Sequence, residues 1–262
     1  MKKIAFISDI HGNLEALKAV LADIEKRNIH IIYGLGDYIA KGIHAKECYE
    51  LLKKHCQVLI AGNCDLHFSK EMTKENKDAR MIFNHQLTTP NMRLELSQLP
   101  LYAEFYMSGR LCRVFHATQD QVNGFVVSRS SVEEKLKMFG PGKIVEGDQY
   151  ADIVLYGHTH TPYFDRVANR TLINVGSVGN GLEIYQDENL NGNPLETVDA
   201  TYFILEGDYQ SKTWSTLSYQ WVKVNYDIEK ELANQKVNIE KEAYEKELRY
   251  GIYRDMHHIN KA

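Results

Sequence analysis

Short apolar segments recur along the N-terminal part of the chain, and polar residues follow each of them directly. These segments occupy residues 3–8, 29–33 and 57–60, and stretches with apolar residues at helical spacing separate them. This strand–helix–strand alternation predicts a layered α/β sheet. Because side chains at strand ends share one edge of a sheet, we expect the polar residues that follow the strands to gather there.

Capping signals mark where the helices begin. Asn13 suits the N-cap of the first helix, whose apolar residues follow at helical spacing. A second helix is predicted at residues 45–54. A third is predicted to extend from Ser130 or Ser131 to about Phe139, with acidic residues in its first turn. Further strands are predicted at residues 111–115, 152–156, 172–175, 201–205 and 213–224.

Residues 66–107 interrupt the alternation. The segment is polar, and helical patterns at residues 72–85 and 91–99 predict a helical cap. Apolar and basic cap residues could line a base-binding surface or contact a polyphosphate. The alternative is that they are packed helix faces and solvated charges, as such residues usually are. These residues are Phe68, Met72, Lys77, Arg80, Met81, Phe83 and His85.

The C-terminal part has a different character. A Gly/Asn-rich loop is predicted at residues 187–194, and Asp227 begins a highly charged helix that extends to about Tyr250. We expect a main domain over residues 1–224 and a helical extension over residues 225–262. Packing of this extension on the main domain and self-association into a homo-oligomer both remain open.

Potential metal ligands follow five of the predicted strands. They are Asp9 and His11, then Asp37, then Asn63, then His116, and finally His158 with His160. Mixed nitrogen and oxygen ligation suits Mn, Fe, Co, Ni or Zn, and the lack of thiolates argues against a structural zinc site. Seven ligands are too many for one ion that keeps an open position, but they divide well between two. Asp37 is the natural bridge, and two ions about 3.5–4 Å apart can activate a water and clamp a phosphoryl group.

Each element has a simpler interpretation when taken alone. Asp-x-His is usually a turn or a polar pair, and Gly-Asp or Gly-Asn-x-Asp usually marks a loop. A lone histidine such as His116 is more often a hydrogen-bonded core residue than a ligand. The ordered set, with each element at a strand end, favours a metal site over this series of coincidences.

The same elements resemble the signature of the calcineurin-like metallophosphoesterase superfamily over residues 1–224. They are Asp9-x-His11, Gly36-Asp37, Gly62-Asn63-x-Asp65, His116 and Gly157-His158-x-His160. The resemblance implies an α/β fold, a four-layer αββα sandwich of two mixed sheets flanked by helices. It also implies two divalent cations, with manganese the first choice and Fe, Co, Ni or Zn as alternatives. One cation would be held by Asp9, His11, Asp37 and His160, and the other by Asp37, Asn63, His116 and His158.

The chain departs from the family pattern at Cys64, where many members have a histidine that contacts the scissile phosphate. His67 is the candidate to take over that role, and the alternative, which such residues favour, is an exposed loop residue. Asp65 is expected to orient a neighbour. With the bridging Asp37 and with Asn63, these residues form the predicted catalytic set.

The Gly-Asn-Cys-Asp variant and the run at residues 173–179 are similar to diadenosine tetraphosphatase-like, or YfcE-like, phosphodiesterases. The whole chain resembles asymmetric diadenosine tetraphosphate hydrolases. This implies hydrolysis of phosphodiester or phosphoanhydride bonds in small nucleotides by a metal-bridging hydroxide, with ATP and AMP as products. A phosphoprotein phosphatase is the rival enzyme. A non-catalytic interaction module, as in a retromer subunit of this fold, is a further alternative.

Charge and composition restrict the binding partners and the cellular location that we expect for the protein. The net charge is −4 and the sequence has no basic stripe, so we expect no stable nucleic-acid binding. No apolar run is long enough for a membrane span, and the first residues lack the apolar region of a signal peptide. Four scattered cysteines indicate a reducing compartment, so a cytoplasmic location is expected.

Overall fold

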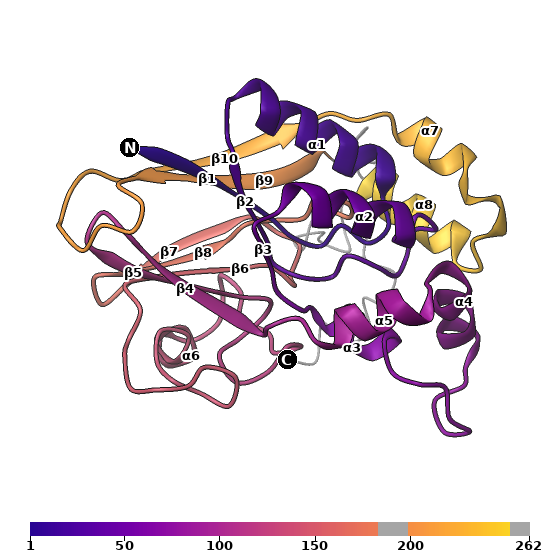
Figure 1. Cartoon of the computed structure of the whole chain (residues 1–262), viewed down its shortest axis with the longest axis horizontal. Helices are drawn as coiled ribbons and strands as arrows, with labels where there is room; N and C mark the ends of the chain where they lie inside the picture. The colour runs from indigo at the N-terminus through magenta and orange to yellow at the C-terminus, as the bar shows by residue number, and fades with distance from the viewer. Residues whose placement is uncertain (183–198, 252–262) are drawn as a thin grey trace.

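The computed structural model describes residues 1–182 and 199–251. Two five-stranded mixed sheets face each other (Figure 1). The first has the order β10-β9-β1-β2-β3, formed by Ser218–Val224, Ala200–Gly207, Lys2–Ile7, Ile31–Gly34 and Val58–Leu59. The second has the order β4-β5-β6-β8-β7, formed by Tyr102–Met107, Arg110–Phe115, Ile153–Tyr156, Arg170–Asn174 and Tyr163–Val167. β1–β3 are parallel to one another, as are β5, β6 and β8, and antiparallel strands flank them.

Helices cover the sheets. α1 (Leu14–Lys26) and α2 (Ala45–His55) lie over the first sheet, and α6 (Val132–Lys137) lies on the side of the second (Figure 1). The predicted sandwich of two mixed sheets flanked by helices is confirmed. The remaining helices are α3 (Asn63–Phe68), α4 (Ala79–Leu87), α5 (Pro90–Ser97), α7 (Ile228–Ala233), the 3-10 turn η1 (Gln235–Val237) and α8 (Lys241–Tyr250). No helix of the described residues has the length and apolar character needed to cross a membrane.

The main core lies between the two sheets. Alternate side chains of β1 point to opposite faces, so that Phe6 enters this core while Ile7 packs under α1. The ring of Phe6 stacks on Phe105 of the second sheet at 6.0 Å between centroids, and Tyr33 meets Phe105 edge-on at 5.3 Å. Burial of these rings stabilises the face-to-face packing of the sheets.

The first helix forms as its sequence predicts. The Asn13 side chain accepts a hydrogen bond from the N–H of Ala16 at 3.0 Å, which confirms the predicted N-cap. Leu17, Val20 and Ile24 recur at helical spacing and are buried against the first sheet. The helix is therefore fixed at the point where the chain leaves β1.

Two strands were not predicted. β4 occupies the end of the segment assigned to the helical cap, beyond the helices predicted at residues 72–85 and 91–99. β4 and β5 are joined by Ser108 and Gly109, and β7 and β8 by Ala168 and Asn169, all with positive φ. Two such residues form a tight hairpin turn, and the pairing of each strand with its neighbour outweighs weak local signals.

The C-terminal segment also contains several short helices where one continuous helix was expected. Instead of one helix from Asp227 to Tyr250, the chain forms α7, η1 and α8. The Asn238 side chain donates to the carbonyl of Lys41 at 2.7 Å and to Gln235 Oε1 at 2.8 Å, which favours a bend at this point. The loop predicted at residues 187–194 lies outside the described residues.

The position of Phe6 gives a test of the inter-sheet core. Phe6→Ala should lower the free energy of unfolding by about 3–5 kcal/mol, because the cavity between the sheets cannot close fully. Urea unfolding measures this change. Phe125→Ala is the matched control, since that ring is 42% exposed, and it should change stability far less. Equal effects of the two substitutions would contradict the assigned core.

Candidate metal centre

The seven predicted ligands come together at the strand ends. One cluster contains Asp9, His11 and His160, and a second contains Asp37, His116 and His158. Within each cluster the potential ligand atoms lie within 4.8 Å of one another. Asn63 joins the second cluster, because its Oδ1 lies 3.1 Å from His116 Nε2. Residues that are up to 151 positions apart in the sequence thus share one small volume.

Asp37 lies between the two clusters. Its Oδ2 is 3.7 Å from His11 Nε2, and its Oδ1 is 3.5 Å from His116 Nε2. One oxygen therefore faces each cluster. This is the arrangement that a carboxylate needs if it is to contact two cations at once.

Backbone carbonyls fix the direction of three imidazole rings. The Nδ1 atoms of His11, His116 and His160 lie 3.1, 2.7 and 2.6 Å from the carbonyl oxygens of Ile39, Leu35 and Asn180. Because a carbonyl only accepts, each Nδ1 must carry the proton and donate it. Each Nε2 is then directed into the clusters as a potential ligand, which is the usual support of metal-binding histidines.

The first cluster holds buried acceptors that face one another. Asp9 Oδ1 is buried, and no donor in the described part of the chain makes a hydrogen bond of normal geometry to it. His160 Nε2 lies 3.2 Å away from this oxygen and 3.2 Å from His11 Nε2. Unpaired buried acceptors are costly, and a cation among them would relieve the cost. The donor set therefore fits a divalent cation.

The carboxylates dominate the electrostatics of the second cluster. Burial lowers the pKa of His116, but the Asp37 and Asp9 carboxylates and the Leu35 carbonyl together outweigh burial and raise it to about 10. Burial raises the pKa of Asp37, but His116, His11 and His158 together outweigh it and hold the pKa of that carboxyl well below its usual value. The cluster thus favours positive charge at His116 Nε2, whether a proton or a cation supplies it.

Backbone strain is concentrated at the same residues. Asp9, His11, Asp37, His158 and His160 have φ values of 54°, 50°, 55°, 65° and 61°. Residues other than glycine rarely adopt this left-handed region, which costs about 1–3 kcal/mol each and must be held by surrounding contacts. Neighbouring loops hold the strained backbone, since the N–H of Asp9 donates to Gly36 and that of His11 to Asp37, both at 3.0 Å.

Asp65 faces the backbone instead of the clusters. Its carboxylate accepts from the N–H groups of Asp37, Tyr38 and Gly62 at 2.7, 2.9 and 2.9 Å. Burial, and then the nearby Asp37 charge, raise the pKa of Asp65 to about 7. The geometry makes Asp65 a group that fixes the loop around Asp37, in keeping with the expected orienting role.

The residues next to Asn63 occupy different environments. The N–H of Cys64 donates to Asp37 Oδ1 at 2.8 Å, and its Sγ lies near His11 and Asp37. Burial, and then Asp37, raise the pKa of the Cys64 thiol well above its usual value, which keeps it neutral. His67 is exposed on α3 and meets the Phe68 ring edge-on at 4.7 Å between centroids. A catalytic role for His67 stays a prediction.

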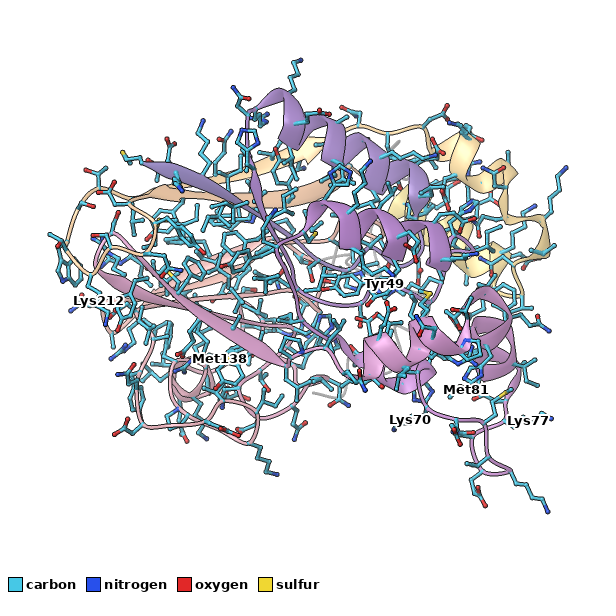
Figure 2. All side chains as sticks on the ribbon, viewed as in Figure 1. Tyr49, Lys70, Lys77, Met81, Met138 and Lys212 are labelled. Atoms are coloured by element: carbon cyan, nitrogen blue, oxygen red, sulfur yellow. The ribbon has the colours of Figure 1, made fainter. Side chains whose placement is uncertain are left out.

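Of the seven cap residues, Phe68, Met81 and Phe83 are buried, whereas Met72, Lys77 and Arg80 are exposed and His85 is half-buried. Phe68 and Met81 are buried in the core that α1 and α2 share, which confirms the interpretation as packed helix faces for both. Arg80 pairs with Glu240 at 3.3 Å and lies over the Phe68 ring. Figure 2 shows Lys77 on the loop before α4, at the outer edge of the molecule. Within the described residues, none of these cap side chains forms a hydrogen bond or an ion pair with a residue of the two clusters.

Two residues that support the predicted ligands were not identified from the sequence. Asn180 accepts the hydrogen bond of His160, and the Ser177 hydroxyl donates to the backbone carbonyl of Asp9 at 2.8 Å. Ser177 lies in the run at residues 173–179, which resembles a subgroup of the family, and Asn180 follows that run directly. The sequence around a polar loop residue does not indicate which group of a distant segment that residue will bind.

Comparison with known proteins agrees with this geometry. Residues 1–186 match the family model described as "Calcineurin-like phosphoesterase superfamily domain". An uncharacterized protein of Methanocaldococcus jannaschii, MJ0912, is 29% identical over 242 residues, which cover 87% of this chain and 89% of that protein.

Two solved structures share the fold, each with a TM-score of 0.72. A metallophosphoesterase from Sphaerobacter thermophilus is 22% identical, with 95% of this chain and 100% of that chain covered. A hypothetical protein, PH1004, from Pyrococcus horikoshii OT3 is 18% identical, with 97% and 100% covered. Since the family match spans well over half of the residues, the chain belongs to the calcineurin-like phosphoesterase superfamily and is a metal-dependent phosphoesterase.

Proposed function

We propose that this enzyme hydrolyses phosphoanhydride or phosphodiester bonds of small nucleotides at a centre of two divalent cations. Asp9, His11 and His160 would hold one cation, and His116, His158 and Asn63 the other, with Asp37 contacting both. The observation that carries the proposal is the position of Asp37, which directs one carboxylate oxygen toward each cluster.

The chain's own residues would prepare this reaction in two ways. Asp65 holds the backbone around Asp37, so that the two carboxylate oxygens of Asp37 keep their separate directions. Backbone carbonyls hold the imidazoles with Nε2 turned inward. When bound, the two cations supply an activated water and stabilise charge on the phosphoryl oxygens. The protein's part is therefore mainly to fix ligands before the substrate arrives.

A small nucleotide is favoured over a phosphoprotein for two reasons. Helices α3–α5 follow Asn63 directly, whereas a phosphoprotein phosphatase is expected to present a shallow open groove. The sequence also resembles a streptococcal asymmetric diadenosine tetraphosphate hydrolase over its whole length. Diadenosine tetraphosphate, cleaved to ATP and AMP, is therefore the proposed substrate.

The metal and location are proposed on chemical grounds. The ligands are imidazole, carboxylate and amide groups, which suit manganese, with Fe, Co, Ni and Zn as alternatives. All four cysteines are free thiols, in keeping with a cytoplasmic location. A non-catalytic module is disfavoured, because the chain retains every predicted ligand.

Removing the charge of Asp37 tests the shared ligand. Asp37→Asn should reduce turnover to background and lower the number of bound cations below two, because an amide is a poor bridge between cations. Metal analysis of the purified protein and hydrolysis of bis-(p-nitrophenyl) phosphate measure both effects. Asp148→Asn, at an exposed carboxylate, is the matched control and should behave as wild type. Full activity of Asp37→Asn would contradict the bridging role.

A methyl group at Gly62 tests the position of Asp37 without changing any ligand. A Cβ at Gly62 would lie 2.2 Å from Asp37 Oδ1, so that Gly62→Ala must displace the carboxylate. Cation affinity, measured by isothermal titration calorimetry, should fall about 10-fold or more. Gly140→Ala is the control. Its added atom would lie 3.0 Å from the edge of the Tyr150 ring, and this ring can move because it is exposed at the surface. Unchanged affinity in Gly62→Ala would argue against a cation at Asp37.

A substrate panel tests the chemistry. With Mn²⁺ added, diadenosine tetraphosphate should be hydrolysed faster than bis-(p-nitrophenyl) phosphate, and a phosphopeptide should remain uncleaved. Chromatography of the products should show ATP with AMP. Two ADP molecules would mean symmetric cleavage. Preferential turnover of the phosphopeptide would favour the phosphoprotein phosphatase instead.

A further inference from the structure

A buried carboxylate of the C-terminal helix lies beside the loops that carry the proposed ligands. Glu247 of α8 has no exposed surface, and its Oε2 accepts a hydrogen bond from Asn180 Nδ2 at 3.0 Å. The same oxygen lies 3.8 Å from Lys41 Nζ. Figure 1 shows α7 and α8 at the end of the molecule toward which β1 runs. Glu247 therefore connects α8 to this end of the sandwich.

Asn180 relays this contact to two proposed ligands. Its carbonyl oxygen accepts the hydrogen bond of His160 Nδ1 at 2.6 Å. Its N–H donates to Ser177 Oγ at 2.9 Å, and that hydroxyl donates to the carbonyl of Asp9. Lys41 Nζ donates to Asn180 Oδ1 at 2.6 Å. Every polar group of Asn180 is thus used to hold this loop in place.

The C-terminal segment also contacts the loop around His11. Asn238 donates to the carbonyl of Lys41, and the next residue, Gly42, donates its N–H to the carbonyl of His11 at 2.8 Å. A Cβ at Gly42 would lie 2.8 Å from the hydroxyl of Tyr244, so α8 packs directly on this loop. The loops of both His11 and His160 are therefore held from the same side.

Docking of α8 alone does not explain a buried acid. Tyr244 and Leu248 already bury apolar surface between α8 and α7. A buried carboxylate costs free energy unless it is paired, and Glu247 meets Asn180 and Lys41, both of which lie outside α8. The buried Glu247 carboxylate is better explained by the Asn180 side chain that it orients.

We propose that Glu247 is a positioning residue for the cation at Asp9, His11 and His160. It fixes Asn180, and the Asn180 carbonyl fixes the proton on Nδ1 of His160 and directs Nε2 toward the cation. The inference rests on the proposed metal centre and extends it beyond residues 1–186, which the family match covers. The C-terminal helices then belong to the metal site as well as to the fold.

The test compares substitutions at Glu247 in the full chain. Glu247→Met keeps the volume but removes the acceptor, so Mn²⁺ should bind about 10- to 100-fold more weakly at one of two sites. Glu247→Gln retains an oxygen that can accept from Asn180, and its Mn²⁺ affinity should stay close to that of wild type. Glu242→Ala, at an exposed acid of α8, should leave Mn²⁺ affinity unchanged. Isothermal titration calorimetry gives the affinity and the number of sites.

A spectroscopic readout separates positioning from a purely structural role. The Co²⁺-loaded protein should show altered visible absorption bands in Glu247→Met but not in Glu247→Gln, because ligand geometry changes only when Asn180 is released. A variant that loses thermal stability but keeps wild-type Mn²⁺ affinity and Co²⁺ bands would overturn the inference. If Glu247→Met does not fold, Glu247→Asp withdraws the carboxylate from Asn180 and must weaken Mn²⁺ binding. A wild-type chain that binds no cation would refute the metal centre itself.

Discussion

The rest of the site depends on one electrostatic constraint, which is the burial of several oxygen and nitrogen acceptors within a few ångströms of one another. Asp9 Oδ1, His11 Nε2 and His160 Nε2 form the plainest case, since no hydrogen bond of normal geometry satisfies Asp9 Oδ1 within the described residues. Such a group is unfavourable unless positive charge joins it. The proposed cations supply that charge, and the surrounding fold keeps the acceptors from moving apart.

The fold supplies this restraint at several levels. Parallel strands of two facing sheets bring their carboxyl ends together, and the Phe6–Phe105 contact helps to hold the sheets face to face. Left-handed backbone at Asp9 and Asp37 turns the chain sharply at the strand ends. Asp65 then ties the Asp37 loop to the start of α3. The Phe6–Phe105 contact and Asp65 lie outside the proposed ligand set, and the geometry of the proposed ligands depends on them.

The C-terminal segment belongs to the same system of supports. Its charged sequence predicted only an extension that either packs or self-associates. In the structure its buried residue Glu247 contacts Asn180, whose carbonyl holds His160. A proposed metal ligand and a residue of α8 are therefore linked through one intermediate, Asn180. The boundary between a main domain and an extension at residue 224 stays a prediction, and hydrogen bonds cross it within the described residues.

The sequence by itself determined the layered α/β class, the first helix with its Asn13 cap, and the strand ends that carry Asp9, Asp37 and His158. These features follow from local patterns, namely apolar runs, helical periodicity and the polar residues after them. Only the tertiary structure decided the pairing of β4 and β7, the backbone groups that Asp65 binds and the link from Glu247 to His160. A local pattern fixes what a segment prefers, whereas these features depend on contacts between segments distant in sequence, for which a single sequence carries no signal.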